Sequence, residues 1–255
     1  MATREPEQSI VISNEVRRDV DIILWSMRLQ RIKRFTHQRF WETETRDAEY
    51  AARAEPSPAL ESVADHSWHV ADCVMILADY CDNISLSRGL ELAILHDKME
   101  IIIDDWSPLG RDGSGRKSHA FNLQRKLQKD SAEREAIEVY IEKLRPGLRK
   151  QQLELLHEML ECRSPEARFV KAIDKIQALA FVHSKKQGEM HDRHIDFSLR
   201  YSEQACVLCP PLSAHFLELR RRLIRAVAKK RKVRARSVEA IVSRPDMLPL
   251  FAGKP

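Results

Sequence analysis

One stretch, residues 91–106, constrains the fold of this chain more than any other. It reads ELAILHDKMEIIIDDW and is apolar on nearly every face of a helix, so it predicts a buried helix that ends near Ile103. An imidazole and several acids lie within it, at His96, Asp97, Glu100 and Asp105. Charged side chains are rarely left inside such a segment unless they are paired or bound to a metal. The stretch therefore predicts a polar site inside a helical core.

Two other apolar helices each add one candidate ligand. His66 lies on the inner face of a helix predicted over 61–81, and Asp174 lies in a later apolar helix. Either residue alone is more typical of a structural histidine or a buried ion-pair partner. With His96 and Asp97 they form a mixed nitrogen and oxygen set, which suits Mn, Fe, Co, Ni or Zn and leaves positions open for water and substrate. We therefore expect one divalent metal per subunit, with Mg as a further candidate.

The rest of the chain also has a helical pattern. Its 43% hydrophobic residues suffice for a core, and its seven glycines and few Val- or Thr-rich alternating runs argue against a sheet. Ser164 and Pro165 predict a helix N-terminus, and 104–118 predicts a Gly-containing loop that is a candidate lid. Further helices are expected from about 15 and at about 119–144, 148–162, 195–208 and 212–235, with a weakly structured tail over the last twenty residues. The predicted fold class is all-α.

The length of 255 residues suits one large domain with an appendage. We expect a flexible N-terminal arm at 1–14, the main helical domain at 15–208, and a basic helix and tail at 209–255. Within the main domain, the charged and Ala-rich segment 42–58 is interpreted as an insertion. No internal repeat is visible.

The net charge of +5 is unevenly distributed. Residues 213–236 hold ten Arg or Lys and one Glu, a net charge of +9, which leaves the rest of the chain near −4. A protein that binds nucleic acid with its whole surface would usually spread its positive charge over a face. The segment 220–236 is therefore a candidate for weak nucleic-acid contact, and a solvated charge run is the alternative.

The sequence also bears on location. No apolar stretch of about 18 residues is present, so no membrane span and no membrane partner are expected. The first residues lack the apolar segment of a secretory signal, and the five cysteines are an odd count. These features favour a cytoplasmic protein with free thiols.

The ordered candidates resemble a known family. His66, the pair His96-Asp97 and Asp174 match the H…HD…D signature of the HD-domain metal-dependent phosphohydrolases. The local context is similar to that of the HD-domain 5'-deoxynucleotidases at 28–34, 61–67, 96–100, Asp105 and Asp174. This resemblance extends over about 25–205 and implies an HD-domain helical bundle. It also implies removal of the 5'-phosphate from (deoxy)nucleoside monophosphates by a metal-bound water, and a homodimer.

The resemblance implies a role for each matched residue. The metal ligands are His66, His96, Asp97 and Asp174. Arg34 matches the phosphate-contacting arginine, since a guanidinium can grip two phosphate oxygens at once. Glu100 matches a carboxylate near the metal-bound water and the reacting phosphate. Asp105 matches an acid that orients the water or protonates the leaving 5'-oxygen.

The chain departs from the family pattern after the central helix. A Gly-Asp-hydrophobic-Pro turn is usual there, whereas 104–108 reads DDWSP, which changes the backbone freedom at Asp105. Lys117, with Arg116 and His119, is a candidate for binding additional phosphates. Two alternatives to the monophosphatase therefore stay open. One is an HD-type dNTP triphosphohydrolase that releases tripolyphosphate, and the other is a nucleic-acid-binding helical scaffold that keeps an HD core.

Two weaker metal hypotheses come from other histidines. His69 lies one helical turn after His66 and is expected to be partly exposed. A second, structural zinc would use His191, His194, Cys206 and Cys209, although this region is an ordinary helix within the resemblance.

Overall fold

The computed structural model describes residues 13–34, 60–110 and 113–242 of the chain. Within these ranges the chain is helical and has no strand, apart from an isolated antiparallel bridge between Lys33 and Ser62. The prediction of an all-α fold is confirmed. None of the described helices has the length and apolar character needed to cross a membrane.

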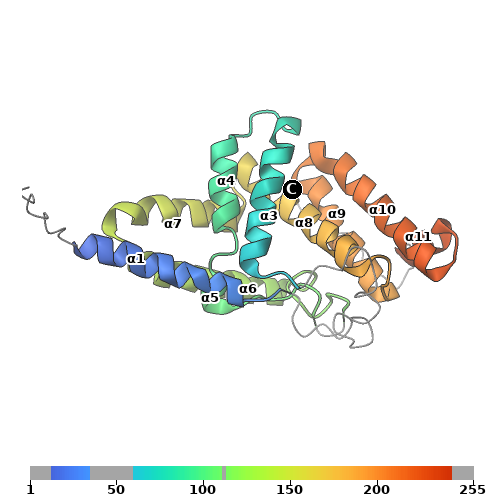
Figure 1. Cartoon of the computed structure of the whole chain (residues 1–255), viewed down its shortest axis with the longest axis horizontal. Helices are drawn as coiled ribbons and strands as arrows, with labels where there is room; N and C mark the ends of the chain where they lie inside the picture. Colours follow the sequence, from blue (N-terminus) through green and yellow to red (C-terminus); the bar gives the residue numbers. More distant parts are fainter. Residues whose placement is uncertain (1–12, 35–59, 111–112, 243–255) are drawn as a thin grey trace, which may run out of the picture.

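The helices form an elongated assembly (Figure 1). α6 and α7 pack together at one end, α3 and α4 stand in the middle, and α8 to α11 extend to the other end. The helices are α1 Asn14–Ser26, α3 Val63–Leu77, α4 Leu86–Leu95, α5 Glu100–Ile103, α6 Leu123–Lys143, α7 Pro146–Glu161, α8 Pro165–Lys186, α9 Asp192–Leu208, α10 Ser213–Arg231 and α11 Ala235–Val242. Short 3-10 turns lie at Met27–Arg31 (η1), Ala78–Tyr80 (η2) and Pro210–Leu212 (η3).

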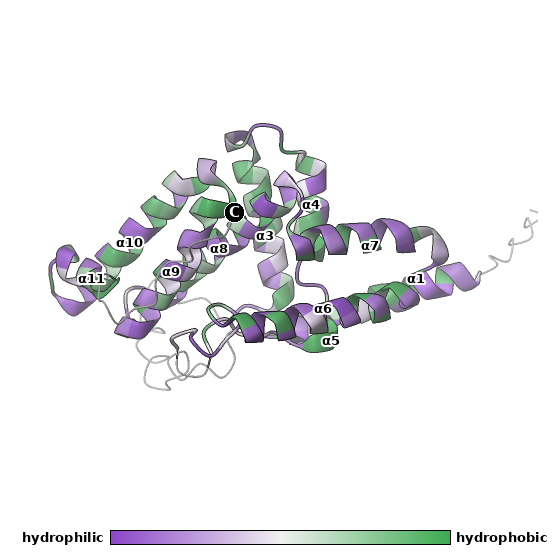
Figure 2. Cartoon of the chain, turned by 180° about the vertical axis from the view of Figure 1, so that it is seen from behind, coloured by the Kyte–Doolittle hydropathy of each residue, from purple (hydrophilic) through white to green (hydrophobic). Residues whose placement is uncertain are grey.

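α8 is the central helix of the fold. It contacts α3, α4, α9 and α10, and hydrophobic residues recur along most helices in Figure 2. Phe169, Val170 and Ile173 join one core with α3, α4 and α7, and Leu179 and Val182 join another with α9, α10 and α11. Because α8 is covered on both sides, the carboxylate of Asp174 in its middle is held inside the protein.

Side-chain caps fix the starts of the two helices that carry isolated candidate ligands. At α3, Ser62 and Asp65 form a capping box, in which each side chain accepts a hydrogen bond from the other residue's backbone N–H. At α8, Ser164 Oγ accepts from the Ala167 N–H, and Pro165 occupies the first turn, as predicted. Local sequence therefore sets where both helices begin.

The predicted continuous helix to Ile103 is wrong. α4 and α5 are separated by a turn at 96–99. His96 Nδ1 lies 2.7 Å from the Ala93 carbonyl oxygen, which the Asp97 N–H would use in a continuous helix. The following backbone N–H groups instead bond three residues back, which tightens the chain.

Two further predictions need correction. The last twenty residues are not all a weak tail, because α11 forms and buries Val238 and Ile241. The central stretch is not buried on every face either, since Ile94 and Ile102 are exposed. The 42–58 insertion and nearly all of the N-terminal arm lie outside the described residues.

Candidate metal centre

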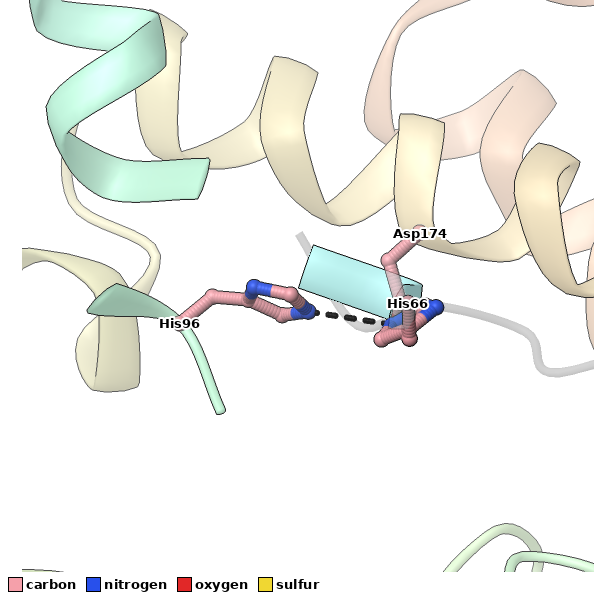
Figure 3. Close-up of side chains that lie close together, drawn as sticks. All are labelled: His66, His96 and Asp174. Carbon is pink, nitrogen blue, oxygen red and sulfur yellow. Dashed lines mark hydrogen bonds and ion pairs between the residues drawn. The ribbon is translucent and has the colours of Figure 1, made fainter. Parts of the chain in front are cut away.

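The four predicted metal ligands come together where α3, the α4–α5 turn and α8 meet. His66, His96 and Asp174 point toward one another in Figure 3, and their ligand atoms all lie within 4.8 Å of one another. His66 Nε2 lies 3.1 Å from His96 Nε2 and 3.2 Å from Asp174 Oδ1. Asp97 Oδ2 lies 3.1 Å from His96 Nε2 and 3.5 Å from His66 Nε2. We call these four residues the metal cluster.

Hydrogen bonds at the outer nitrogens fix the tautomers of both imidazoles. His96 Nδ1 faces the carbonyl oxygen of Ala93, which can only accept, so Nδ1 carries the proton. His66 Nδ1 lies 2.8 Å from Gln177 Oε1, and Gln177 Nε2 donates over 3.1 Å to Glu61 Oε2. Since that carboxylate accepts, the amide is oriented and His66 Nδ1 is also the protonated nitrogen. Each Nε2 lone pair therefore faces the cluster, as in a metal-binding histidine.

The facing atoms of the metal cluster are all acceptors. They are two imidazole nitrogens with lone pairs and two carboxylate oxygens. A 3.1 Å approach of the His66 and His96 Nε2 lone pairs is repulsive unless a positive charge lies between them. Divalent transition metals bind such a mixed set of imidazole nitrogen and carboxylate oxygen ligands. The residues present therefore fit one divalent cation.

Protonation states in the cluster also suit a metal. Burial opposes the charge of both acids, but positive charge on the neighbouring imidazoles of His96 and His66, which they carry only when protonated, would hold the pKa of Asp97 well below its usual range. Lys175 and His66 do the same for the pKa of Asp174, and Lys175 Nζ donates to Asp174 Oδ2 over 2.7 Å. Burial lowers the pKa of His66. Carboxylates bind metals in the ionised form and imidazoles in the neutral form, so a bound cation would take over the positive charge that favours ionised Asp97 and Asp174.

Arg34, the predicted phosphate contact, lies beside the cluster and is buried. Its backbone N–H donates to the carbonyl oxygen of Glu61, next to the bridge that ties this segment to the start of α3. Arg34 Nη1 donates to Glu61 Oε1 over 2.9 Å, and Nη2 lies 3.9 Å from Asp174 Oδ1. A guanidinium held in this way lies within reach of an anion at the metal cluster.

Glu100 is a buried acid near the same cluster. It is 4% exposed, and its Oε2 has no hydrogen-bond partner among the described residues. Burial raises the pKa of Glu100 well above its usual range, and the charges of Asp97 and Asp105 raise it further. Buried polar oxygens are usually hydrogen-bonded, so Oε2 is an atom that a bound water or substrate at the cluster would satisfy.

Asp105 follows α5 through a strained turn. The preceding residue, Asp104, has φ 65° and ψ 167°, a conformation that glycine adopts far more readily. This is the position where the resemblance expects glycine, so the chain keeps the turn at a cost of about 1–3 kcal/mol. Burial lowers the pKa of Arg34, but the charges of Glu61, Asp174 and then Asp105 outweigh burial and raise it.

The loop cations are less closely associated with the cluster. Lys117 and Arg116 are exposed, and within the described chain Lys117 has no hydrogen bond or ion pair with a cluster residue. His119 is closer to the charged interior, because burial and the charges of Lys129 and Lys175 lower its pKa to about 3. The role of Lys117 in phosphate binding stays a prediction.

The weaker metal hypotheses gain no geometric support. His69 is exposed, and its ring packs edge-on against Trp68. Cys209 Sγ lies 3.2 Å from Cys81 Sγ instead of beside a histidine. Among the described residues, His, Cys and acidic groups gather with metal-binding spacing only at the cluster that contains His66.

Comparison with known proteins decides the family. A family model described as HD domain matches residues 51–210. The chain belongs to the HD domain family. The family predicted from the H…HD…D pattern is therefore confirmed, and the metal cluster lies within the matched part of this HD domain.

Curated relatives of this HD-domain chain carry related names. The human 5'-deoxynucleotidase HDDC2 is 33% identical over 119 residues, which cover 47% of this chain and 52% of the relative. The 5'-deoxynucleotidase hdd1 of Schizosaccharomyces pombe is 32% identical over 124 residues, which cover 47% of this chain and 56% of the relative. The chain spans about half the length of these relatives.

Solved structures share the fold of this HD domain. A predicted metal-dependent phosphohydrolase from Magnetospirillum magnetotacticum MS-1 aligns with a TM-score of 0.56 at 20% identity, over 84% of this chain and 97% of that one. A conserved hypothetical protein from Pyrococcus furiosus aligns with a TM-score of 0.53 at 24% identity, over 79% and 99%. At these identities the likeness is one of fold.

Sequence reasoning missed the residues that support the ligands. Gln177 and Glu61 form a hydrogen-bonded chain between His66 and Arg34, and Lys175 neutralises Asp174. Gln177 lies three residues after Asp174 and therefore on the same face of α8. This spacing could have identified Gln177 as a residue near the cluster from the sequence alone. Such outer partners orient metal ligands and are part of a metal site.

Replacing Gln177 with Leu is expected to weaken metal binding without unfolding the protein. The change removes the acceptor of the His66 Nδ1–H and leaves Glu61 Oε2 without that donor. Loss of such a partner typically lowers metal affinity about 10–100-fold. Titration calorimetry with Co²⁺ or Mn²⁺ measures the change. Gln152→Leu is the matched control, because Gln152 on α7 accepts from the hydroxyl of Tyr140 on α6, away from the cluster. Equal affinity in both variants would show that Gln177 does not position His66.

Proposed function

We propose that this protein is a divalent-metal-dependent phosphohydrolase that removes the 5'-phosphate from deoxynucleoside monophosphates. The observation that carries this proposal is the metal cluster with an arginine beside it. Four metal-suited acceptor atoms and the Arg34 guanidinium lie around one small volume. The names of the relatives support the nucleotide class. The ligands that would hold the cation are His66, His96, Asp97 and Asp174.

Arg34 is the substrate-binding group of this proposal. A bound divalent cation would acidify water and neutralise charge on a phosphoryl oxygen. Arg34 would hold the remaining phosphate oxygens, because Glu61 already fixes its guanidinium and burial strengthens its electrostatic interactions. The energetic cost of orienting this side chain is therefore met before substrate binds.

Glu100 and Asp105 would handle protons. Burial raises the pKa of Glu100 well above its usual range, which favours its protonated form, and its Oε2 makes no hydrogen bond within the described chain. Asp105 lies at the end of α5, from which it would approach the leaving 5'-oxygen. A buried acid that exchanges a proton with substrate or water typically contributes about 10²–10⁴-fold to rate.

The position of the loop cations favours a monophosphate over a triphosphate. A triphosphate needs cations for the two further phosphates, and the candidates Lys117 and Arg116 are exposed in the loop. Arg34 is the buried arginine next to the cluster and is sufficient for one phosphate. The triphosphohydrolase hypothesis remains open, and the experiment below distinguishes it from the monophosphatase.

A metal-by-nucleotide panel tests the proposal. Purified protein is incubated with Co²⁺, Mn²⁺, Zn²⁺, Fe²⁺, Ni²⁺ or Mg²⁺ and with ribo- and deoxynucleoside mono- and triphosphates. Phosphate, pyrophosphate and tripolyphosphate are detected separately. We expect phosphate release from a deoxynucleoside monophosphate that chelator abolishes and metal restores. Tripolyphosphate release would replace the monophosphatase with the triphosphohydrolase. No turnover with any metal would leave only the scaffold reading.

A further inference from the structure

The outward side of α10 carries a dense row of cations. Residues 213–236 hold ten Arg or Lys and one Glu, and they follow the end of the family match at 210. The apolar side of α10 is buried against α8 and α9 through Phe216, Leu223, Ile224 and Val227. Arg221, Arg222, Arg225 and Lys229 lie on the opposite, exposed side of α10. Figure 1 shows this helix at one end of the molecule.

Half of these cations have carboxylate partners and half do not. Ion pairs with Glu218, Glu239, Glu189 or Asp192 involve Arg220, Arg221, Arg222, Lys230 and Arg231. The other five are exposed and have no ion pair within the described chain, namely Arg225, Lys229, Lys232, Arg234 and Arg236. We call these five residues the basic face. They run from the middle of α10 through the turn into α11.

We propose that the basic face binds the phosphate backbone of nucleic acid without reading its sequence. Several unpaired cations on one continuous segment can neutralise several phosphates of one strand, and the release of their counterions drives the association. Three of the five residues are arginines, whose planar guanidinium matches phosphate oxygens better than an ammonium does. A nucleic-acid strand supplies the negative charges that these five cations lack within the described chain.

An anionic membrane surface fits the same face less well. A helix that lies in a bilayer interface inserts an apolar side next to its cations. The apolar side of α10 is instead occupied by the protein core. Within residues 213–242 the large exposed apolar side chains are Leu217 and Val233, which are too few for such an insertion.

The basic face is separate from the metal cluster. Its residues come from α10, α11 and the turn between them, whereas the cluster comes from α3, the α4–α5 turn and α8. Substitutions on the basic face are therefore expected to leave phosphohydrolase activity unchanged. Nucleic-acid binding and hydrolysis can fail independently.

Fluorescence anisotropy of the full chain with a labelled 30-base-pair mixed-sequence DNA duplex tests the proposal. Binding is measured between 50 and 200 mM KCl, and a duplex RNA of the same length forms a second arm. Each neutralised phosphate contributes about −0.9 to the slope of log K against log salt concentration. If all five cations engage, the expected slope is about −4.5. The double variant Arg225→Gln/Lys229→Gln should make the slope shallower by about 1.8.

A charge-matched variant supplies the control. Lys143→Gln/Lys150→Gln removes two exposed cations that likewise have no ion pair in the described chain, from α6 and α7 at the other end of the molecule. We expect this control to bind duplex as the parent does. Equal slopes for the two variants, no duplex binding at 50 mM KCl, or binding to phosphatidylserine vesicles but not to duplex would each overturn the proposal. Circular dichroism confirms that both variants keep their helical content.

Discussion

Replacing Asp174 with Ala is expected to remove the bound cation and the hydrolase activity together. Asp174 Oδ1 lies 3.2 Å from His66 Nε2, so the change takes one of four acceptors out of the cluster. A divalent cation contributes several kcal/mol to such a reaction, and its loss corresponds to a rate decrease of roughly 1,000-fold or more. Metal content by plasma mass spectrometry and phosphate release measure the two effects. The variant should also lose any rise in unfolding temperature that added metal gives the parent protein.

Asp196→Ala controls for the removal of a buried, paired acid. Asp196 is buried on α9 and accepts from Arg200 Nε over 2.6 Å, outside the metal cluster. This control should lower the unfolding temperature but keep the metal. Retained metal and full rate in Asp174→Ala would disprove the ligand assignment. We expect Asp174→Ala to keep its fold, because Lys175 keeps its hydrogen bond to the Tyr201 hydroxyl. A helical far-ultraviolet spectrum of the variant would show that the loss of metal is local.

Helix pattern and acid placement made much of this arrangement predictable. The three-residue spacing from Asp97 to Glu100 and the apolar runs around His66 and Asp174 indicated interior polar groups on separate helices. Caps at Ser62 and Ser164 are local and place the starts of α3 and α8. A pattern of this kind encodes which groups face inward, because burial of charge is costly without a partner.

The remaining details depend on contacts that periodicity does not encode. The α4–α5 turn arises because the His96 side chain takes a backbone oxygen, which is a competition between side chain and helix. The link from Gln177 to Glu61 joins residues 116 positions apart. Asp104 adopts a glycine-like conformation although its own preference opposes it, so tertiary packing imposes the turn before Asp105. Each of these features lies at the candidate site, where local and global preferences most often conflict.

Replacing Glu100 with Gln is expected to lower activity and raise stability at neutral pH. The carboxamide has the shape of the protonated acid but cannot exchange a proton, so the rate should fall by about 10²–10⁴-fold. Burial raises the pKa of Glu100 well above its ordinary 4.5 in the folded chain. Above that ordinary pKa, unfolding releases a proton from the parent protein, and its stability therefore declines as pH rises. The Gln variant lacks this decline.

The pH dependence separates the variant from a merely disruptive one. Without metal, the parent and Glu100→Gln should unfold at similar denaturant concentrations at pH 4, and the variant should be the more stable at pH 7. Asp97 and Asp174 have lowered pKa values and lose their stabilising effect as pH falls, but they do so in both proteins and cancel in the difference. Equal stability at pH 7 would mean that the pKa of Glu100 is not raised in the folded chain. If Glu100→Gln is more stable but keeps the full rate, Glu100 takes no part in the reaction and its burial is a feature of packing.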